Sequence, residues 1–279
     1  MMVDLGAPVG EEAAAAARSL LGHAPVGVAY SGGVDSATLL ALAVRALGPQ
    51  DVVAVLGVSP SLATEERSAA HRTAEEIGAR VVEVETHEGE SKAYRANGPD
   101  RCFHCKDELF SRIDAELVAE LGLAAVAYGE NADDAKRPDR PGARAATEHR
   151  VLRPLAEARM TKAMVRETAR ALGLPVADKP AAPCLASRIP HFEEVTPEKL
   201  RQVDRAEAAL HRLGFADCRV RHHGEVARIE LLAEDIMRAA EHREEVDRAV
   251  REAGFRFAAV DLRGIQSGAF TLPLVSVRG

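Results

Sequence analysis

Short apolar runs alternate with longer amphipathic stretches through the first half of the chain. The runs that read as buried strands cover residues 26–30, 52–58, 81–84 and 124–128. Helical patterns at 37–47 and 62–77 separate the first three of them. Strands joined by helical crossovers predict a parallel sheet with helices on both faces. The expected fold class is therefore α/β, with a doubly wound parallel sheet.

The pattern changes near His191. Its later elements are predicted to be charged helices at 197–213 and 235–253 and short strands at 218–220, 227–232 and 255–262. A tail of about 85 residues with its own apolar positions is large enough to form a small domain. We therefore expect two domains, one over residues 1–190 and a smaller C-terminal α+β domain over residues 191–279.

Residues Ser31–Ser36 read Ser-Gly-Gly-Val-Asp-Ser and connect the first strand to the first helix. The glycines permit a sharp turn that exposes backbone N–H groups, and the helix presents its positive N-terminal end. The loop is predicted to bind phosphate, against the alternative of a turn without a ligand. It has no lysine for a terminal phosphate, and Asp35 beside two hydroxyls suits Mg²⁺ on a leaving pyrophosphate. The motif resembles the signature of the PP-loop ATP pyrophosphatase superfamily, whose members adenylate an oxygen and release pyrophosphate.

The segment after the strand at 124–128 reads Gly-Glu-Asn-Ala-Asp-Asp and includes Asn131 and Asp134. Ligands of doubly wound sheets bind beyond the carboxyl ends of the strands, which is where this segment lies. Such a loop can bind a ribose, a metal or an amide. The alternative is a solvated acidic turn that caps a helix.

A third polar segment lies near residue 160. Thr161 is a good N-cap for a helix that runs through Arg170. Lys162 at the start of that helix, or Arg153 before it, could contact a phosphate.

Three of the four cysteines form a second group of candidate site residues. Cys102 and Cys105 have the CxxC spacing that lets one turn present two sulfurs to one metal, and Cys184 follows a proline in a loop-like segment. Three thiolates can hold a [4Fe–4S] cluster with one open iron. The alternatives are Zn²⁺ with His104 as a fourth ligand, or thiols that are redox-active or unliganded. Cys218 lies in a strand-like segment and is expected to be a small buried residue.

Together these motifs resemble the LarE family of ATP-dependent sulfur transferases, which helps to build the nickel-pincer nucleotide cofactor of lactate racemase. The shared motifs occur in order over nearly the whole chain: Ser-Gly-Gly-Val-Asp-Ser, Arg-Cys-x-x-Cys-Lys, Gly-x-Asn-x-Asp-Asp, Arg-Pro-Gly and Pro-Cys-Leu-Ala-Ser-Arg-Ile-Pro. Some members carry only the cysteine of the last motif and give up its sulfur, leaving dehydroalanine. Others carry three cysteines and use an iron–sulfur cluster. This chain resembles the three-cysteine kind.

The resemblance implies a mechanism with ATP and Mg²⁺. The residues expected to bind the nucleotide are Ser31, Gly32, Gly33, Asp35, Ser36, Asn131 and Asp134. A carboxylate of pyridinium-3,5-biscarboxylic acid mononucleotide, the small-molecule substrate, would attack the α-phosphorus, and sulfur would convert the acyl-adenylate into a thiocarboxylate. The expected metal ligands are Cys102, Cys105 and Cys184. The expected catalytic residues are Asp35, Lys106 and Cys184, with Lys106 or Arg188 keeping the sulfur nucleophile deprotonated.

The C-terminal domain is expected to bind the substrate and to mediate oligomerisation. Arg219 and Arg221 alternate along one strand, so both can reach one phosphate; the alternative is a solvated strand face. The resemblance assigns them, with Arg188, to substrate binding. It gives Glu207 and Glu230 as metal-binding or oligomer-contact carboxylates.

Further expectations about binding follow from the resemblance. Gln266 stands where we expect the family to have an arginine, which puts one phosphate contact in doubt. The resemblance also implies a homo-oligomer of six chains. Sulfide or a cysteine desulfurase would be the sulfur source.

Composition narrows the remaining function classes. No apolar run approaches the roughly 20 residues that span a bilayer, and the first residues lack a signal core, so we expect a cytoplasmic enzyme. A formal net charge of −7 argues against a nucleic-acid partner. It therefore weighs against a rival interpretation, a PP-loop enzyme that thiolates tRNA. A second rival is a nucleotide- and metal-binding module without turnover.

Overall fold

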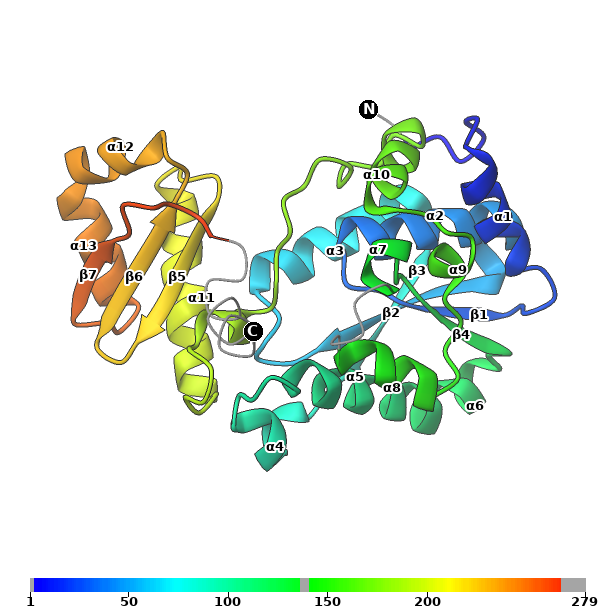
Figure 1. Ribbon diagram of the computed structural model, residues 1–279, viewed down its shortest axis with the longest axis horizontal. Coiled ribbons are helices and arrows are strands. Elements are labelled where there is room, and N and C mark those ends of the chain that lie inside the picture. The colour runs from blue at the N-terminus through cyan, green and yellow to red at the C-terminus, as the bar shows by residue number, and fades with distance from the viewer. Residues whose placement is uncertain (1–2, 136–140, 267–279) are drawn as a thin grey trace, which may run out of the picture. The chain divides into compact units, whose positions relative to one another are not determined.

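The computed structural model describes residues 3–135 and 141–266, which form two compact units (Figure 1). The first unit contains the described residues up to 59 together with 66–88 and 102–182. The second contains 60–65, 89–101 and the described residues from 183 onward.

The sheet of the first unit has four parallel strands in the order β3-β2-β1-β4. Their bounds are Val26–Ala29 for β1, Val52–Val58 for β2, Arg80–Glu85 for β3 and Ala125–Tyr128 for β4. Val26 of β1 pairs with Val52 on one side and with Ala125 on the other. The predicted doubly wound α/β fold is confirmed.

Helices cover both faces of this sheet (Figure 1). Before β4 these helices are α1 (Glu11–Ser19), α2 (Val34–Leu47), α3 (Thr64–Ile77), α5 (Arg101–Arg112) and α6 (Val118–Leu121), whereas α4 (Lys92–Arg95) belongs to the second unit. After β4 come α7 (Ala132–Ala135), α8 (Pro141–Glu148), α9 (Pro154–Glu157) and α10 (Lys162–Ala171). On one face, Val55 packs with Phe110 of α5 and Ala145 of α8 in one apolar cluster. On the other, Val28 and the residues of α2 from 39 to 43 are fully buried.

The strand order creates a switch point between β1 and β4. The chain leaves β1 toward β2 and β3 on one side, and β4 lies on the other side of β1. Loops that leave two adjacent parallel strands in opposite directions open a crevice at their carboxyl ends, where ligands bind. Leu152 extends this edge because it bridges to Ala127 of β4 in the parallel direction.

The second unit is built on a three-stranded sheet in the order β5-β6-β7. Strands β5 (Cys218–His223) and β6 (Val226–Leu231) are antiparallel, and β7 (Phe257–Val260) pairs parallel to β6. Its main helices are α11 (Pro197–Arg212), α12 (Asp235–Glu241) and α13 (Arg243–Glu252). The prediction of one helix over 235–253 is wrong, because His242 leaves helical geometry at φ −98° and ψ 30° and separates α12 from α13.

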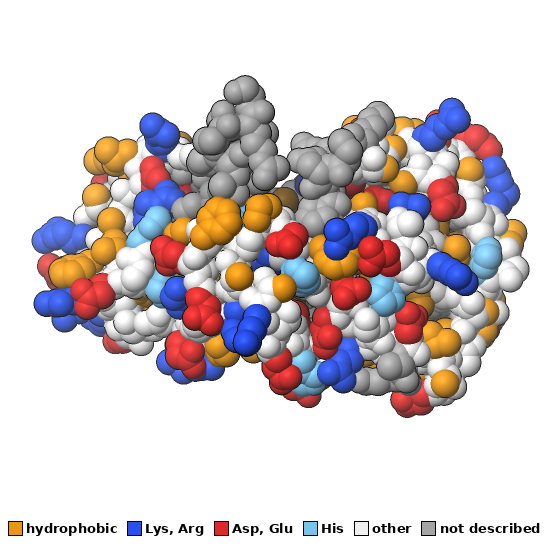
Figure 2. Space-filling model, turned by 60° about the horizontal axis from the view of Figure 1, so that its bottom comes forward, with side chains coloured by type: hydrophobic (Ala, Val, Ile, Leu, Met, Phe, Trp, Pro, Cys, Tyr) orange, Lys and Arg blue, Asp and Glu red, His pale blue; other side chains and the backbone are white. Residues whose placement is uncertain are grey.

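The charged surface and the apolar content of the helices bear on where the protein can reside. On the described part of the face drawn in Figure 2, acidic and basic side chains are interspersed. Among the described residues, no helix has the length and apolar composition needed to cross a bilayer.

Candidate active site

The loop Ser31–Ser36 is an internally bonded turn at the carboxyl end of β1. Ser36 Oγ donates to Gly33 O at 3.1 Å and accepts from Ser31 N at 3.2 Å. Gly32 has φ +72°, and a Cβ there would lie 2.8 Å from the Cβ of Ala70, so both its dihedral angle and its packing require glycine. The loop thus presents the first turn of α2 toward the switch point, as the sequence predicted.

Asp35 is the centre of a polar cluster beside this loop. Its Oδ1 accepts from Asn131 Nδ2 at 3.1 Å, and its Oδ2 lies 2.5 Å from Lys162 Nζ. Asn131 Nδ2 also donates to Asp134 Oδ2 at 3.0 Å. The structure therefore brings together four residues that the sequence placed on three separate segments. Two carboxylates joined by an amide, at the positive end of α2, form a donor set suited to Mg²⁺ bound to phosphate.

The segment after β4 also caps a helix. Asn131 is buried, and its Oδ1 accepts from the backbone N–H groups of Asp133 and Asp134 at 3.0 and 3.1 Å at the start of α7. Thr161 caps α10 by accepting from Met164 N at 3.3 Å, which confirms that prediction. Asn131 can therefore cap α7 and take part in a ligand site, because its Oδ1 bonds to the helix backbone while its Nδ2 bonds to Asp35.

Glu130 is a site residue that the sequence reasoning missed. Its side chain is 1% exposed, and neither carboxylate oxygen has a hydrogen-bond partner among the described residues. The nearest cation is the guanidinium of Arg153, with Nη1 3.6 Å from Oε2. Its neighbour Gly129 packs against the PP-loop so closely that a Cβ would lie 2.9 Å from the backbone nitrogen of Ser36. The only signal in the sequence was its position directly after a buried strand.

The CxxC motif lies in the first turns of α5. Cys102 is exposed and Cys105 is partly exposed, and the i, i+3 spacing puts both on one side of the helix. Lys106, the next residue, donates a short hydrogen bond from Nζ to the hydroxyl of Tyr128 and lies 3.8 Å from the centre of its ring. Tyr128 ends β4, so Lys106 lies at the carboxyl edge of the sheet.

Cys184 lies in the second unit, at the N-cap of a short 3₁₀ turn, Leu185–Arg188, and is exposed. Arg188 is 4% exposed and donates to Pro183 O at 2.7 Å. Burial lowers the pKa of its guanidinium, but the charges of Glu207 and of Cys184 outweigh that effect and the pKa is raised. Arg188 is thus bonded to the backbone of the residue directly before Cys184.

Among the described residues, no three His, Cys, Asp or Glu side chains lie together as a metal site. Cys102 and Cys105 belong to the first unit, and Cys184 belongs to the second. Cys218 is 1% exposed, and burial raises the pKa of its thiol, which confirms the prediction that it is a buried residue.

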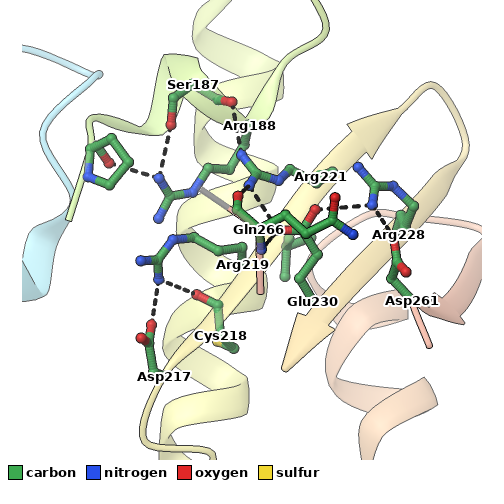
Figure 3. Close-up of polar contacts among 12 residues, drawn as sticks. Ser187, Arg188, Asp217, Cys218, Arg219, Arg221, Arg228, Glu230, Asp261 and Gln266 are labelled. Atoms are coloured by element: carbon green, nitrogen blue, oxygen red, sulfur yellow. Dashed lines mark hydrogen bonds and ion pairs between the residues drawn. The ribbon is translucent and has the colours of Figure 1, made fainter. Parts of the chain in front are cut away.

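The predicted phosphate-binding arginines lie in a network of buried ion pairs (Figure 3). Arg219 bonds to Asp217, and Arg221 donates to Glu230 Oε2 at 2.7 Å and to Ser187 O at 3.1 Å. Both arginines are less than 10% exposed, so the alternative of a solvated strand face is wrong.

The two glutamates predicted for this region are also enclosed. Glu230 is 0% exposed and is held between Arg221 and Arg228, and Glu207 is 7% exposed and bound by Arg188. Each of these carboxylates therefore has arginine partners within its own chain, and the expected metal or oligomer contacts of both stay predictions. Arg228, which the sequence reasoning missed, also pairs with Asp261. Gln266 joins this network through its backbone, since its carbonyl accepts from Arg221 at 3.1 Å and its N–H donates to Glu230 Oε2 at 3.5 Å.

Comparison with known proteins places the chain in a family. The sequence model of the asparagine synthase family matches residues 13–110, which include the PP-loop. An uncharacterised protein of Synechocystis sp. is 44% identical over 243 residues, covering 86% of this chain and 90% of that protein. The pyridinium-3,5-bisthiocarboxylic acid mononucleotide synthase of Lactiplantibacillus plantarum is 36% identical over 243 residues, covering 87% of each chain. The chain belongs to the LarE family.

Membership of the LarE family agrees with the PP-loop found in the first unit. The chain is a PP-loop ATP-dependent enzyme of the sulfur transferase type. A more distant relative, an uncharacterised protein of Methanocaldococcus jannaschii, is 26% identical over 237 residues, covering 84% of this chain and 88% of that protein.

Proposed function

We propose that this LarE-family chain adenylates a carboxylate of pyridinium-3,5-biscarboxylic acid mononucleotide and converts it into a thiocarboxylate. The relative from L. plantarum is named as the synthase of the corresponding bisthiocarboxylic acid mononucleotide, which supports this substrate. The observation that carries the proposal is that one LarE-family chain combines a PP-loop cluster with an exposed thiol beside a buried arginine.

In the first half-reaction, a carboxylate oxygen of the substrate attacks the α-phosphorus of ATP, and pyrophosphate leaves. Backbone N–H groups of the PP-loop and the N-terminal end of α2 would bind the phosphates. Asp35 and Asp134 would bind Mg²⁺, which neutralises the leaving pyrophosphate. Lys162 is held beside Asp35 and would contact a phosphate oxygen.

In the second half-reaction, a sulfur nucleophile adds to the acyl carbon and AMP leaves. If Cys184 itself is the donor, its thiolate forms a thioester. A base then removes the Cα proton of Cys184, and the Cβ–S bond breaks to leave the thiocarboxylate and dehydroalanine. Arg188, bonded to the carbonyl group of Pro183 directly before Cys184, would supply the positive charge that stabilises the thiolate.

The three accessible thiols also fit an iron–sulfur cluster. Cys102, Cys105 and Cys184 are exposed or partly exposed, whereas Cys218 is enclosed, and thiolates are the ligands that [4Fe–4S] clusters require. A cluster bound by these three would leave one iron open and would supply a sulfide as the sulfur donor. We propose this form, with Zn²⁺ as the alternative metal.

The two domains would bind different substrates. Residues 1–190 would bind ATP, and residues 191–279 would bind the mononucleotide and mediate oligomerisation. Arg219 and Arg221, with Arg188, would bind its phosphate. Each of these guanidinium groups is already oriented by a carboxylate or carbonyl, so the cost of ordering them on binding is small. Free sulfide or a cysteine desulfurase would renew the sulfur.

The direct test is pyrophosphate release with the dicarboxylate mononucleotide as acceptor, followed by mass spectrometry of the product. We expect release that depends on the acceptor and a product in which sulfur has replaced oxygen. Asp35→Asn should reduce the rate by about 10²-fold or more, as expected for loss of one preorganised charge-stabilising group. Release that is equally fast with tRNA, or absent with every acceptor, would refute the substrate assignment.

The sulfur source is tested by anaerobic purification and measurement of iron and acid-labile sulfide, for wild type and Cys184→Ala. Iron and sulfide that are lost in the variant support a three-cysteine cluster. Iron-free wild type that loses the mass of one H₂S on turnover supports Cys184 as the donor.

A further inference from the structure

A buried carboxylate without hydrogen bonds lies at the carboxyl edge of the sheet in the first unit. Glu130 comes two residues after the end of β4, and its side chain is 1% exposed. Neither of its oxygens has a hydrogen-bond partner among the described residues. The preceding residue, Gly129, is fixed against the PP-loop, since a Cβ there would lie 2.9 Å from Ser36 N. Burying a charged group without hydrogen bonds is unfavourable, so stability does not explain a carboxylate at this position.

The charge partner of Glu130 is an arginine whose hydrogen-bond donors are unused. Arg153 Nη1 lies 3.6 Å from Glu130 Oε2, which is an ion-pair distance but too long for a hydrogen bond. Within the part of the chain that the structure describes, the Arg153 guanidinium has no other polar partner. Its side chain is 35% exposed, and a guanidinium carries five N–H donors in a planar fork. Arg153 is therefore held by one charge while its donors can still bind an anion.

Arg153 lies at the same sheet edge as the PP-loop but farther along it. Leu152 bridges to Ala127 of β4 in the parallel direction, and β4 pairs with β1. Adjacent strands are about 4.8 Å apart, so the backbone of Arg153 lies about 10 Å from the end of β1, where the PP-loop begins. Lys162 is the cation next to the loop itself, since its Nζ lies 2.5 Å from Asp35 Oδ2. Arg153 is therefore suited to a group that lies beside the bound phosphates.

The proposed reaction requires a cation at such a place. The carboxylate that is to be adenylated must approach the α-phosphorus of ATP, and the two negatively charged groups repel each other unless a cation neutralises the carboxylate. The carboxylate must also be oriented toward the phosphorus, and a guanidinium does this by binding both of its oxygens. Mg²⁺ and Lys162 would neutralise the leaving pyrophosphate, so the acceptor needs a cation of its own.

We propose that Arg153 binds the acceptor carboxylate and that Glu130 is a positioning residue for the Arg153 guanidinium. The ligand class is an organic carboxylate, here a carboxylate on a pyridine ring. Glu130 restrains the guanidinium through its charge and leaves the five donors for the acceptor. The inference rests on the proposed function, because it takes the group that is adenylated to be a carboxylate.

The test is the binding of pyridine-3,5-dicarboxylate to the full chain saturated with Mg²⁺ and α,β-methylene-ATP, which cannot release pyrophosphate. Pyridine-3,5-dicarboxamide is the matched ligand without carboxylates. The variants are Arg153→Met, Arg153→Lys, Glu130→Gln and Glu130→Leu. The control is Arg170→Met, which removes an exposed arginine of α10 that pairs with Asp178. Affinity for the ATP analogue and pyrophosphate release with ATP and the dicarboxylate mononucleotide are measured for each protein.

We expect Arg153→Met to bind the dicarboxylate about 10- to 100-fold more weakly, as for loss of a charge-assisted hydrogen bond, with affinity for the ATP analogue unchanged. Arg153→Lys should recover part of this affinity, because an ammonium keeps the charge but not the planar fork. The dicarboxamide should bind wild type and Arg153→Met equally, and Arg170→Met should match wild type.

Both Glu130 variants should bind the dicarboxylate about 2- to 10-fold more weakly, which is the cost of ordering one flexible side chain on binding. Glu130→Leu should lose this affinity without a loss of folding stability, because it removes a buried charge that has no hydrogen bond. Weaker binding by a protein that is at least as stable separates a positioning role from a structural one. Unchanged binding in both variants would overturn the role of Glu130.

Equal dicarboxylate affinity in wild type and Arg153→Met would overturn the role of Arg153. A loss in Arg153→Met that is confined to the ATP analogue would also overturn it and would make Arg153 a phosphate-binding residue. Wild type that releases pyrophosphate with the mononucleotide but does not bind the dicarboxylate would refute the inference and leave the proposed function standing. Wild type that releases no pyrophosphate would refute the proposed function, and the dicarboxylate titration would still decide whether Arg153 binds carboxylates.

Discussion

The buried ion pair between Arg188 and Glu207 should dominate the stability of the second unit. The two side chains are 5% and 9% exposed, and they form two hydrogen bonds of 2.9 and 3.1 Å. Glu207 Oε1 also accepts from Val220 N at 2.8 Å. Glu207→Ala would leave a buried guanidinium without its counter-charge and a backbone N–H without an acceptor. Removing one partner of a buried pair costs about 3–5 kcal/mol.

Cys218 provides a probe for this effect because its thiol is enclosed in the same unit. It is 1% exposed, and its raised pKa makes it unreactive in the folded state. Alkylation of Cys218 therefore measures the population of opened molecules when opening is fast relative to alkylation. A loss of about 3–5 kcal/mol corresponds to alkylation faster by about 10²- to 4 × 10³-fold, since 1.4 kcal/mol is a factor of ten. Pulsed alkylation with mass spectrometry of the Cys218 peptide gives this rate.

The matched control is Glu198→Ala on the same helix. Glu198 pairs with Arg201 at 2.8 Å, but these side chains are 70% and 55% exposed, and exposed pairs contribute little to stability. This variant should alkylate Cys218 at nearly the wild-type rate. The double variant Arg188→Met, Glu207→Leu should open less often than Glu207→Ala, because no unpaired charge remains. Similar rates for Glu207→Ala and Glu198→Ala would show that the buried pair is not what holds the unit.

Three further predictions concern the first unit. Gly129→Ala would place a Cβ 2.9 Å from Ser36 N, so it should lower the free energy of unfolding in denaturant by about 1–3 kcal/mol. It should also weaken ATP binding in equilibrium titrations, and an unchanged ATP affinity would contradict this packing. Glu130→Leu should raise the free energy of unfolding by about 1 kcal/mol, because it removes a buried polar group that has no hydrogen-bond partner; a lower denaturation midpoint would show that the carboxylate is stabilising. Burial lowers the pKa of His149, but hydrogen bonds to two aspartates outweigh it and raise the pKa above 6.5. Protonated His149 should therefore stabilise the folded state fully below about pH 6.5, and this contribution should disappear as the pH rises through the raised pKa. The unfolding free energies of wild type and His149→Gln should differ at low pH and converge at high pH.

The parallel sheet could be predicted because each buried strand is a continuous apolar run. Val52–Val58 matches its predicted bounds, and the other three strands of this sheet differ from theirs by one or two residues. Once those strands were assigned, the switch point brought Asp35, Asn131 and Asp134 to one edge. The meeting of these loops was thus predictable, because the carboxyl ends of parallel strands lie at one edge of the sheet.

The second unit was less predictable because its polar residues are buried. The alternation of Arg219 and Arg221 indicated a shared face of β5, but the sequence alone does not show whether that face is covered. The carboxylates that pair with buried arginines come from other elements, such as Glu207 on α11 and Glu230 on β6. The break at His242 was missed for a similar reason, since the charged pattern continues through α12 and α13 while the backbone turns.

Lys162 shows how tertiary structure supplied what the loop motif lacks. The PP-loop has no lysine of its own, but Lys162, 127 residues away in sequence, brings its ammonium to Asp35 Oδ2. The other oxygen of Asp35 is bound by Asn131, so both oxygens are occupied before a divalent ion arrives. If Asp35 binds Mg²⁺ as proposed, the ion would weaken this ion pair, because two positive charges beside one carboxylate repel each other. Lys162 lies on the first turn of α10, from which its ammonium would be able to contact a phosphate of the nucleotide instead. Under that proposal, binding of Mg²⁺ and binding of the nucleotide would be coupled through the ion pair of Lys162 and Asp35, since the phosphates would give the lysine a new partner.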